Sequence, residues 1–244
     1  MEVKKTSKEF KEVASEFVSS VGRRVTIVKI ERIQNHQLWQ AYQANKQDVM
    51  QHTNIPERML YHGCPGKCVD SINTNGFTAR LAGTSNGKST NTPSEWNART
   101  YICIYINFTS NLSMYGTGCT SRDGTCIQLV LSPCDAKDVF YLSSCTYVAT
   151  AYGQGIYFAR DASYSAGSNY SVKDRNGHKH IYHCCVLTGV FKVGRANMKV
   201  PPPLNESTTK WCHSTVENEK SPSIFVIYEN NRVYPQHLIT FTEC

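Results

Sequence analysis

The sequence predicts an α+β domain built around a mostly antiparallel β-sheet. Its strand-like runs are short and rich in β-branched and aromatic residues, and its helical patterns are few and brief, which together are typical of this fold class. The length of 244 residues suits one domain, or one domain with an insertion, and a hydrophobic fraction of 40% is enough for a buried core. The expected strands are 24–33, 59–62, 156–159, 179–191, 224–228 and 237–241.

Three helices are expected in the first third of the chain, each with its own local signal. Asn35 can cap one of them, and Asn75-Gly76 ends a short helix that carries Val69 and Ile72. Ser7 begins the first helix, whose apolar residues follow helical spacing: Phe10, Val13, Ala14, Phe17 and Val18.

The second half of the chain predicts mainly strands. Asp161 can cap one helix directly after the strand 156–159. Residues 179–191 have the pattern of one long strand, and the three prolines at 201–203 force a loop after it.

Residues 84–150 differ from their surroundings. They begin with a polar stretch at 84–94, and they contain strand-like runs at 100–108 and 126–131. We expect either an inserted hairpin subdomain or a poorly structured addition at the periphery, with Gly83 and Ala151 close together. The segment holds five cysteines: Cys103, Cys119, Cys126, Cys134 and Cys145.

Charge and cysteine content limit the environment and the partners. A net charge of +7 favours anionic partners such as a dinucleotide pyrophosphate, but a solubilising surface charge is the preferred explanation. The basic residues near the N-terminus are not interleaved with aromatic residues, so nucleic acid is not indicated as a partner. No apolar run is long enough for a signal peptide or a membrane span, and the eleven cysteines cannot all pair within one chain. We therefore expect reduced cysteines, no membrane partner, and a location in the nucleus, the cytoplasm or both.

Two groups of residues have the composition of metal ligands but not the spacing. Cys64 and Cys68 form half of a possible site, and no second Cys or His pair completes it. A second group lies within 178–185, where an extended strand places His178 and His180 on one face and His183 and Cys185 on the other. We expect no metal.

The chemistry of the chain is framed by two short motifs, Tyr61-His62-Gly63 and the run 152–159, followed by Tyr170-Ser171. Each is weak alone, because a histidine at a strand end and a Gly-x-Gly turn are common. In this order they resemble the NAD+ site of the poly(ADP-ribose) polymerase family of ADP-ribosyltransferases. The resemblance covers 1–83 and 151–244. Its other segments are 28–33 with Leu38, Trp39 and Tyr42, and 187–191, 201–203, 222–226 and 234–241.

The resemblance implies a fold and a domain plan. It is closest to the macrodomain-containing, mono-ADP-ribosylating members, and it implies the split antiparallel sheet of ADP-ribosyltransferases with short flanking helices. The whole chain, 1–244, would be one catalytic domain, with 84–150 as an atypical insertion in the loop that covers the donor NAD+ in the family.

The resemblance also assigns roles around NAD+ as the co-substrate. His62 would bind the adenosine ribose, and the backbone of Gly63 would hold the nicotinamide amide. Tyr157 and Tyr170, the second expected on the helix after the strand, would flank the nicotinamide ring, with Phe158 and Ala159 beside it. Ser165, chosen over Ser163 by family spacing, would donate its hydroxyl to the nicotinamide carboxamide. From the residues alone, a satisfied histidine and two core tyrosines remain the alternative.

Ile224 takes the third catalytic position after His62 and Tyr170. Polymer-forming members carry a glutamate there, which binds a ribose hydroxyl and activates the next acceptor. An isoleucine can do neither, so the resemblance implies transfer of single ADP-ribose units to protein side chains, including the chain's own. The alternative is a catalytically inactive module of the same fold that binds NAD+, ADP-ribose or proteins.

Overall fold

The structure, a computed structural model, describes residues 1–52, 57–79, 150–205 and 210–243, which all belong to one compact unit. Of the expected insertion, only Thr150 is described, and Gly83 also lies outside the described residues. The boundaries 84–150 and the closeness of Gly83 to Ala151 therefore stay predictions.

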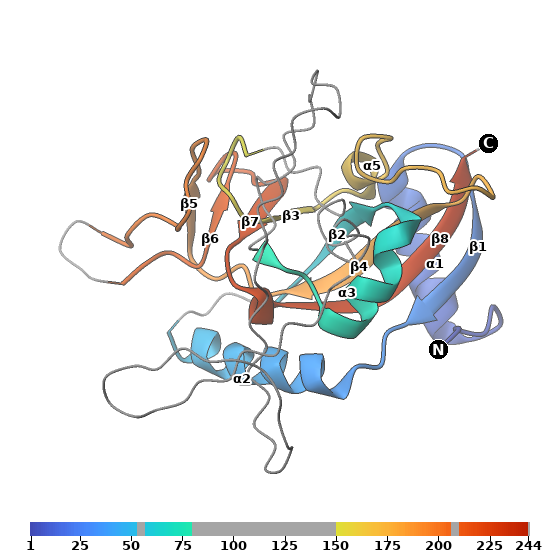
Figure 1. Ribbon diagram of the computed structural model, residues 1–244, viewed down its shortest axis with the longest axis horizontal. Coiled ribbons are helices and arrows are strands. Elements are labelled where there is room, and N and C mark those ends of the chain that lie inside the picture. Colours follow the sequence, from blue (N-terminus) through green and yellow to red (C-terminus); the bar gives the residue numbers. More distant parts are fainter. Residues whose placement is uncertain (53–56, 80–149, 206–209, 244) are drawn as a thin grey trace, which may run out of the picture. The chain divides into compact units, whose positions relative to one another are not determined.

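The described part of the chain forms one sheet of eight strands, in the order β1-β8-β4-β2-β3-β7-β6-β5 (Figure 1). Neighbouring strands are antiparallel except β5 and β6, which are parallel. This confirms the α+β class with a mostly antiparallel sheet. The strands are β1 (Val25–Arg32), β2 (Arg58–Cys64), β3 (Ile156–Ala159), β4 (Lys179–Val186), β5 (Phe191–Val193), β6 (Ser214–Val216), β7 (Ile224–Ile227) and β8 (Val233–Glu243).

The sheet is split between β2 and β3. These two strands share only one residue pair, Tyr61 with Ala159, whereas β2 and β4 share seven, from Arg58–Val186 to Cys64–His180. One half of the sheet is β1-β8-β4-β2 and the other is β3-β7-β6-β5. The opening beyond the shared pair is where the motif residues meet.

Short helices flank the sheet, and local caps explain their ends. The side chain of Ser7 accepts a hydrogen bond from the Phe10 N–H at 3.1 Å, and Asn35 Oδ1 accepts one from the Leu38 N–H at 3.1 Å. Gly76 ends its helix with a φ of 74°. The helices are α1 (Lys8–Val21), α2 (His36–His52), α3 (Val69–Asn75) and α5 (Ala162–Ser165), with 3-10 turns η1 (Gly66–Cys68) and η3 (Asn230–Arg232). None within the described ranges has the length and apolarity to cross a membrane.

Two expectations were wrong in detail. The run 179–191 is two strands, β4 and β5, because Gly189 adopts a φ of 54° and packs so closely on His213 that a side chain there would collide with its ring. Asp161 precedes α5 but makes no side-chain cap. The short strand β6 was not expected from the sequence at all.

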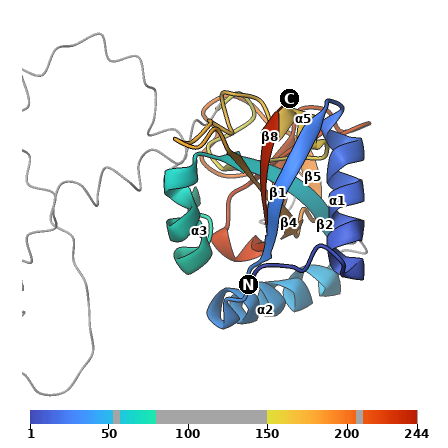
Figure 2. The same ribbon diagram turned by 90° about the vertical axis from the view of Figure 1, so that its right-hand side faces the viewer.

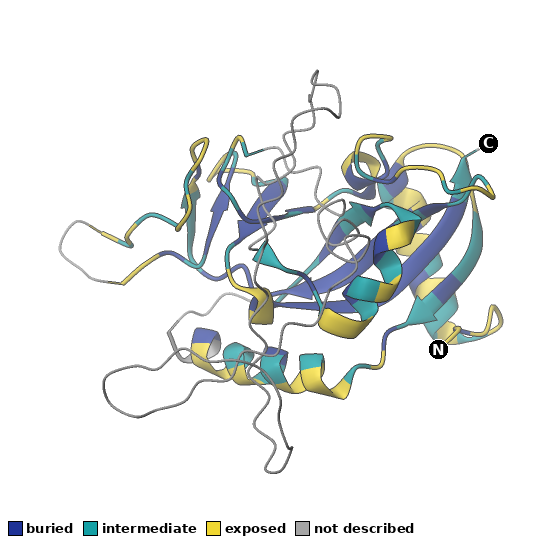
Figure 3. Ribbon diagram, in the orientation of Figure 1, coloured by how far each residue is buried: buried dark blue, intermediate teal, exposed yellow. Residues whose placement is uncertain are grey.

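Helices cover both faces of the sheet, with α1 on one side and α3 on the other (Figure 2). Because side chains alternate along a strand, Tyr61 of β2 packs with the α1 cluster while Leu60 packs with the α3 cluster. The buried colouring in Figure 3 follows the central strands β4, β7 and β8. The core therefore has two layers, separated by the sheet.

A stacked column of rings lies beneath α1. His183 stacks on Tyr61, with ring centroids 4.7 Å apart, and lies 6.4 Å from the ring of His237. Its side chain is only 3% exposed, and neither ring nitrogen has a hydrogen-bond partner, although Nε2 lies 3.6 Å from Glu16 Oε1. Burial, with a smaller contribution from His237, lowers the pKa of His183 to about 4.

The lowered pKa of His183 predicts that the fold becomes less stable in acid. The pKa of His183 is about 6.5 in the unfolded chain and lower in the fold. The free energy of unfolding is therefore unaffected by His183 above about pH 6.5. It falls by about 3 kcal/mol as the pH decreases from 6.5 towards 4, because the unfolded chain takes up the proton first. Urea unfolding at pH 7.5 and 4.5 should show a larger acid penalty in the wild type than in His183→Leu, which cannot titrate. Equal penalties would contradict this.

Candidate active site

The motif residues meet where the two half-sheets part. Ile224 of β7 pairs with Ala159 of β3, and Ala159 pairs with Tyr61 of β2, so the three lie in one row across the junction. His62 and Gly63 follow directly after Tyr61, in the part of β2 that β3 does not pair. The split therefore leaves these two residues open on their β3 side.

His62 bridges the split with its side chain. Its Nδ1 lies 2.8 Å from the carbonyl oxygen of Tyr157. Because a carbonyl only accepts, Nδ1 carries the proton and Nε2 is left as an acceptor. Burial lowers the pKa of His62, and the hydrogen bond to Tyr157 opposes this only in part. The lowered pKa keeps the ring neutral at physiological pH. Phe77 and Phe158 contact the ring at centroid distances of 4.9 and 5.4 Å.

Gly63 must lack a side chain in this fold. A Cβ at Gly63 would collide with the carbonyl oxygen of Ser165 and lie 3.1 Å from Cβ of Tyr170. The glycine thus lets the segment after β3 pack directly on β2. The same bare backbone is what a planar amide ligand needs for close approach.

Tyr157 is turned towards the loop that precedes it. Its hydroxyl accepts a hydrogen bond from the Tyr152 N–H at 3.0 Å and donates one to the Gly153 carbonyl at 2.9 Å. Burial raises the pKa of Tyr157 to about 12, so the hydroxyl stays protonated. No ring contact between Tyr157 and Tyr170 occurs among the described residues.

Tyr170 instead stacks on Tyr164. Their ring centroids are 4.9 Å apart at an angle of 26°, and their hydroxyls are 2.7 Å apart. Tyr170 was expected on the helix that follows β3, and this expectation was wrong. It lies in the turn after α5, because α5 ends at Ser165. Tyr164 is 42% exposed, so the stacked pair offers aromatic surface to a ligand.

Ser165, rather than Ser163, lies beside the glycine. Ser165 is 4% exposed and its backbone contacts Gly63, whereas Ser163 is exposed. The Ser165 hydroxyl donates to the Tyr61 carbonyl at 3.0 Å. In this structure the hydroxyl proton is therefore not available for the expected donation to a carboxamide, and the remaining capacity of the oxygen is that of an acceptor, which suits an amide N–H of a ligand.

Ile224 is buried at the start of β7, and a carboxylate holds its backbone. The Ile224 N–H donates to Glu217 Oε2 at 2.9 Å, and the Ser223 N–H donates to Glu217 Oε1 at 2.6 Å. Loss of hydration acts to raise the pKa of Glu217, but these hydrogen bonds outweigh it and lower the pKa overall. Glu217 is therefore an anion next to Ile224.

The sequence did not single out Tyr164 or Glu217. Tyr164 could have been noticed as an aromatic residue between the two candidate serines. Glu217 has no local signal: it begins the connection between β6 and β7, and it reaches Ser223 at the end of the same connection because these two strands pair.

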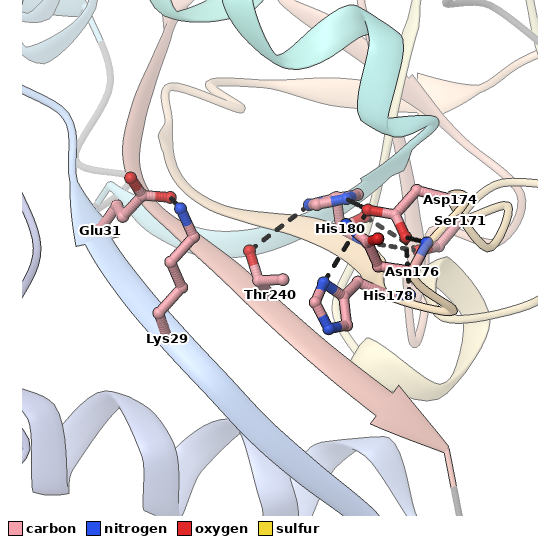
Figure 4. A network of polar contacts seen from close by, with 8 residues as sticks. All are labelled: Lys29, Glu31, Ser171, Asp174, Asn176, His178, His180 and Thr240. Atoms are coloured by element: carbon pink, nitrogen blue, oxygen red, sulfur yellow. Dashed lines mark hydrogen bonds and ion pairs between the residues drawn. The ribbon is translucent and has the colours of Figure 1, made fainter.

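Hydrogen bonds and ion pairs connect His178 and His180 to Asp174 (Figure 4). Asp174 accepts hydrogen bonds from the N–H groups of Asn176 and His178 and lies 3.2 Å from His180 Nε2. No group of three or more potential metal ligands occurs among the described residues. Four described cysteines are free: Cys64, Cys184, Cys185 and Cys212. Cys68 is disulfide-bonded, so the expectation of fully reduced cysteines fails there.

A cavity of about 690 Å³ lies away from this site, lined by residues that include Pro201, Trp211 and Arg232. None of the motif residues lines it. The site at the split is defined by the convergence of its side chains, and this cavity has no part in it.

Comparison with known proteins agrees with the fold. Residues 7–91 match the family model of the poly(ADP-ribose) polymerase catalytic domain. Human protein mono-ADP-ribosyltransferase PARP14 is 31% identical over 236 residues, 96% of this chain and 10% of that protein. Mouse PARP10 is 27% identical over 243 residues, 98% of the chain and 19% of that protein, and human PARP12 is 28% identical over 219 residues, 88% and 22%.

An α+β domain with a split sheet and this residue set defines an ADP-ribosyltransferase-type fold. The chain belongs to the poly(ADP-ribose) polymerase catalytic-domain family. It spans between about a tenth and a fifth of the length of these curated relatives.

The substitution His62→Asn distinguishes the role of Nδ1 from that of Nε2. The asparagine amide N–H₂ can replace Nδ1–H on the Tyr157 carbonyl, but nothing replaces Nε2. We expect an intact fold with NAD+ turnover reduced by roughly 30- to 1000-fold, since one well-placed polar group contributes about 2–4 kcal/mol in such a site. Nicotinamide release and thermal unfolding measure the two effects. Full turnover in a folded variant would exclude this site.

Gly63→Ala tests the close packing of β2 on the segment after β3. The added methyl group would displace Ser165 and Tyr170, at an expected cost of about 1–3 kcal/mol in unfolding free energy and most of the turnover. Gly177→Ala is the matched control, because a Cβ there meets nothing within 4 Å and adds only the strain of its φ of 76°. Normal turnover in Gly63→Ala would show that this contact does not shape the site.

Proposed function

We propose that this chain transfers single ADP-ribose units from NAD+ to protein side chains and releases nicotinamide. Two findings support it. The chain is a member of a catalytic-domain family that uses NAD+ as its co-substrate, and the curated relatives are named as mono-ADP-ribosyltransferases. The residues at the split also have the chemistry that such a reaction needs.

The residues present fit a dinucleotide with a nicotinamide end. Neutral His62 presents Nε2 as an acceptor for a ribose hydroxyl, because Nδ1–H is used by Tyr157. The bare backbone of Gly63 suits the carboxamide, with the backbone carbonyl of Ser165 beside it. The stacked pair of Tyr164 and Tyr170 gives a surface against which the nicotinamide ring can stack. Together these groups hold the donor and orient its reacting bond.

The observation that carries the transfer of single units is the burial of Ile224, which is only 5% exposed at the third catalytic position. Its side chain cannot accept a proton, so it cannot activate a ribose hydroxyl for chain growth. A carboxylate of the acceptor protein can supply the missing charge. Its oxygen forms the new bond to ribose while the bond to nicotinamide breaks, and nicotinamide leaves with that electron pair.

A second candidate is an inactive module of the same fold that binds NAD+, ADP-ribose or a protein. Two observations favour it: Ile224 brings no acid, and the Ser165 hydroxyl is already bonded to Tyr61. The intact His62 and Tyr170 favour the enzyme. For either candidate we propose a location in the nucleus, the cytoplasm or both. The free thiols of four described cysteines support this location, whereas the disulfide at Cys68 argues against it.

Labelled NAD+ distinguishes the candidates. Incubation of the purified chain, with and without added proteins, should give discrete labelled bands on a denaturing gel, from single units on the chain itself and on acceptors. His62→Asn is the matched control and should remove the label. A smear of high mass would show polymer formation, and unlabelled protein that still binds ADP-ribose would establish the inactive module.

A further inference from the structure

The nicotinamide end of the proposed site depends on α5, a helix of only four residues. It carries Tyr164 and Ser165, and the turn after it carries Tyr170. So short a helix has no stability of its own in water, since nucleation is unfavourable and most of its backbone groups lack helical partners. Something outside α5 must therefore hold it.

Three side chains from distant segments bond to the backbone of α5 and its last turn. At the N-terminal end, the Ala162 N–H donates to the Ser20 hydroxyl of α1 at 2.7 Å. Arg23 Nη2, just after α1, donates to the Ser163 carbonyl at 3.0 Å. At the other end, Lys179 Nζ of β4 donates to the Ala166 carbonyl at 2.8 Å. Both ends of α5 are thus tied to the rest of the domain.

The two cations share one carboxylate. Glu243 Oε1, at the end of β8, lies 2.9 Å from Arg23 Nη1 and 2.8 Å from Lys179 Nζ. Lys179 is essentially inaccessible, with its side chain 1% exposed, so its charge needs this counter-ion and cannot be exchanged for water. Arg23 is 40% exposed and forms the solvent side of the cluster.

We propose that Glu243, Arg23 and Lys179 are positioning residues for the nicotinamide subsite. The carboxylate fixes the two cations, and the cations fix the carbonyls of Ser163 and Ala166, on either side of Tyr164 and Ser165. None of the three contacts the dinucleotide-facing groups directly. The inference rests on the proposed function in one respect, that nicotinamide binds at Tyr164, Ser165 and Tyr170.

Two variants of the full chain break the cluster. Arg23→Gln removes the exposed cation, and Lys179→Met keeps the length of the buried side chain without its charge. Arg24→Gln is the matched control for charge, since Arg24 makes no hydrogen bond or ion pair with α5 among the described residues. Circular dichroism and thermal unfolding establish folding. If Lys179→Met does not fold, Arg23→Gln carries the test.

The readouts are calorimetric affinities for nicotinamide and for ADP-ribose, and amide hydrogen exchange at 163–170. Each folded variant should bind nicotinamide at least about tenfold more weakly, with ADP-ribose affinity changed less than about twofold, because a shift of the ring-binding groups by about 1 Å is enough for such a loss. Exchange at 163–170 should be faster than in Arg24→Gln, with or without ligand.

Two results would overturn the inference: unchanged nicotinamide affinity and exchange in both folded variants, or an equal loss of both ligands, which marks a general structural effect. Failure of the proposed function looks different. In that case the wild type itself would bind neither nicotinamide nor ADP-ribose, while the exchange measurement would still report whether the cluster holds α5.

Discussion

A single residue pair, Tyr61 with Ala159, joins the two halves of the sheet, and the site depends on how little the halves share. Backbone groups beyond this pair lose their strand partners and must be satisfied otherwise. The Tyr157 carbonyl takes its hydrogen bond from His62, which holds the imidazole in one tautomer. The split therefore leaves strand backbone unpaired, and one of the unpaired carbonyls fixes the orientation of the His62 ring.

Side chains from distant segments complete this arrangement. Glu217 holds the backbone at the start of β7, and the cluster of Glu243, Arg23 and Lys179 holds α5. In each case an ionised group bonds to the backbone that carries a candidate site residue, and charge-assisted hydrogen bonds are the stronger kind. The site is thus oriented by its supports as well as by its own residues.

The fold and the reaction are separate questions, because one fold can carry several activities. Membership of the family establishes the class of domain. In the proposed reaction, the product would depend on the chemistry of one position, where Ile224 leaves an apolar, buried side chain in the row that runs through Ala159 to Tyr61. Such a site can orient a donor and still leave activation of the nucleophile to the acceptor.

Local patterns were enough for the helix caps at Ser7 and Asn35 and for most strands, because these depend on neighbours three or four residues away. The order of the motifs was likewise enough to suggest the family. The break between β4 and β5, the stack of Tyr164 on Tyr170 and the carboxylates of Glu217 and Glu243 could not be foreseen. Glu243 meets Arg23 and Lys179 only when β1, β8 and β4 pair. The stack of Tyr164 on Tyr170 and the bonds to Glu217 depend on how the chain turns after α5 and between β6 and β7. The order of residue types along the chain does not specify these tertiary arrangements.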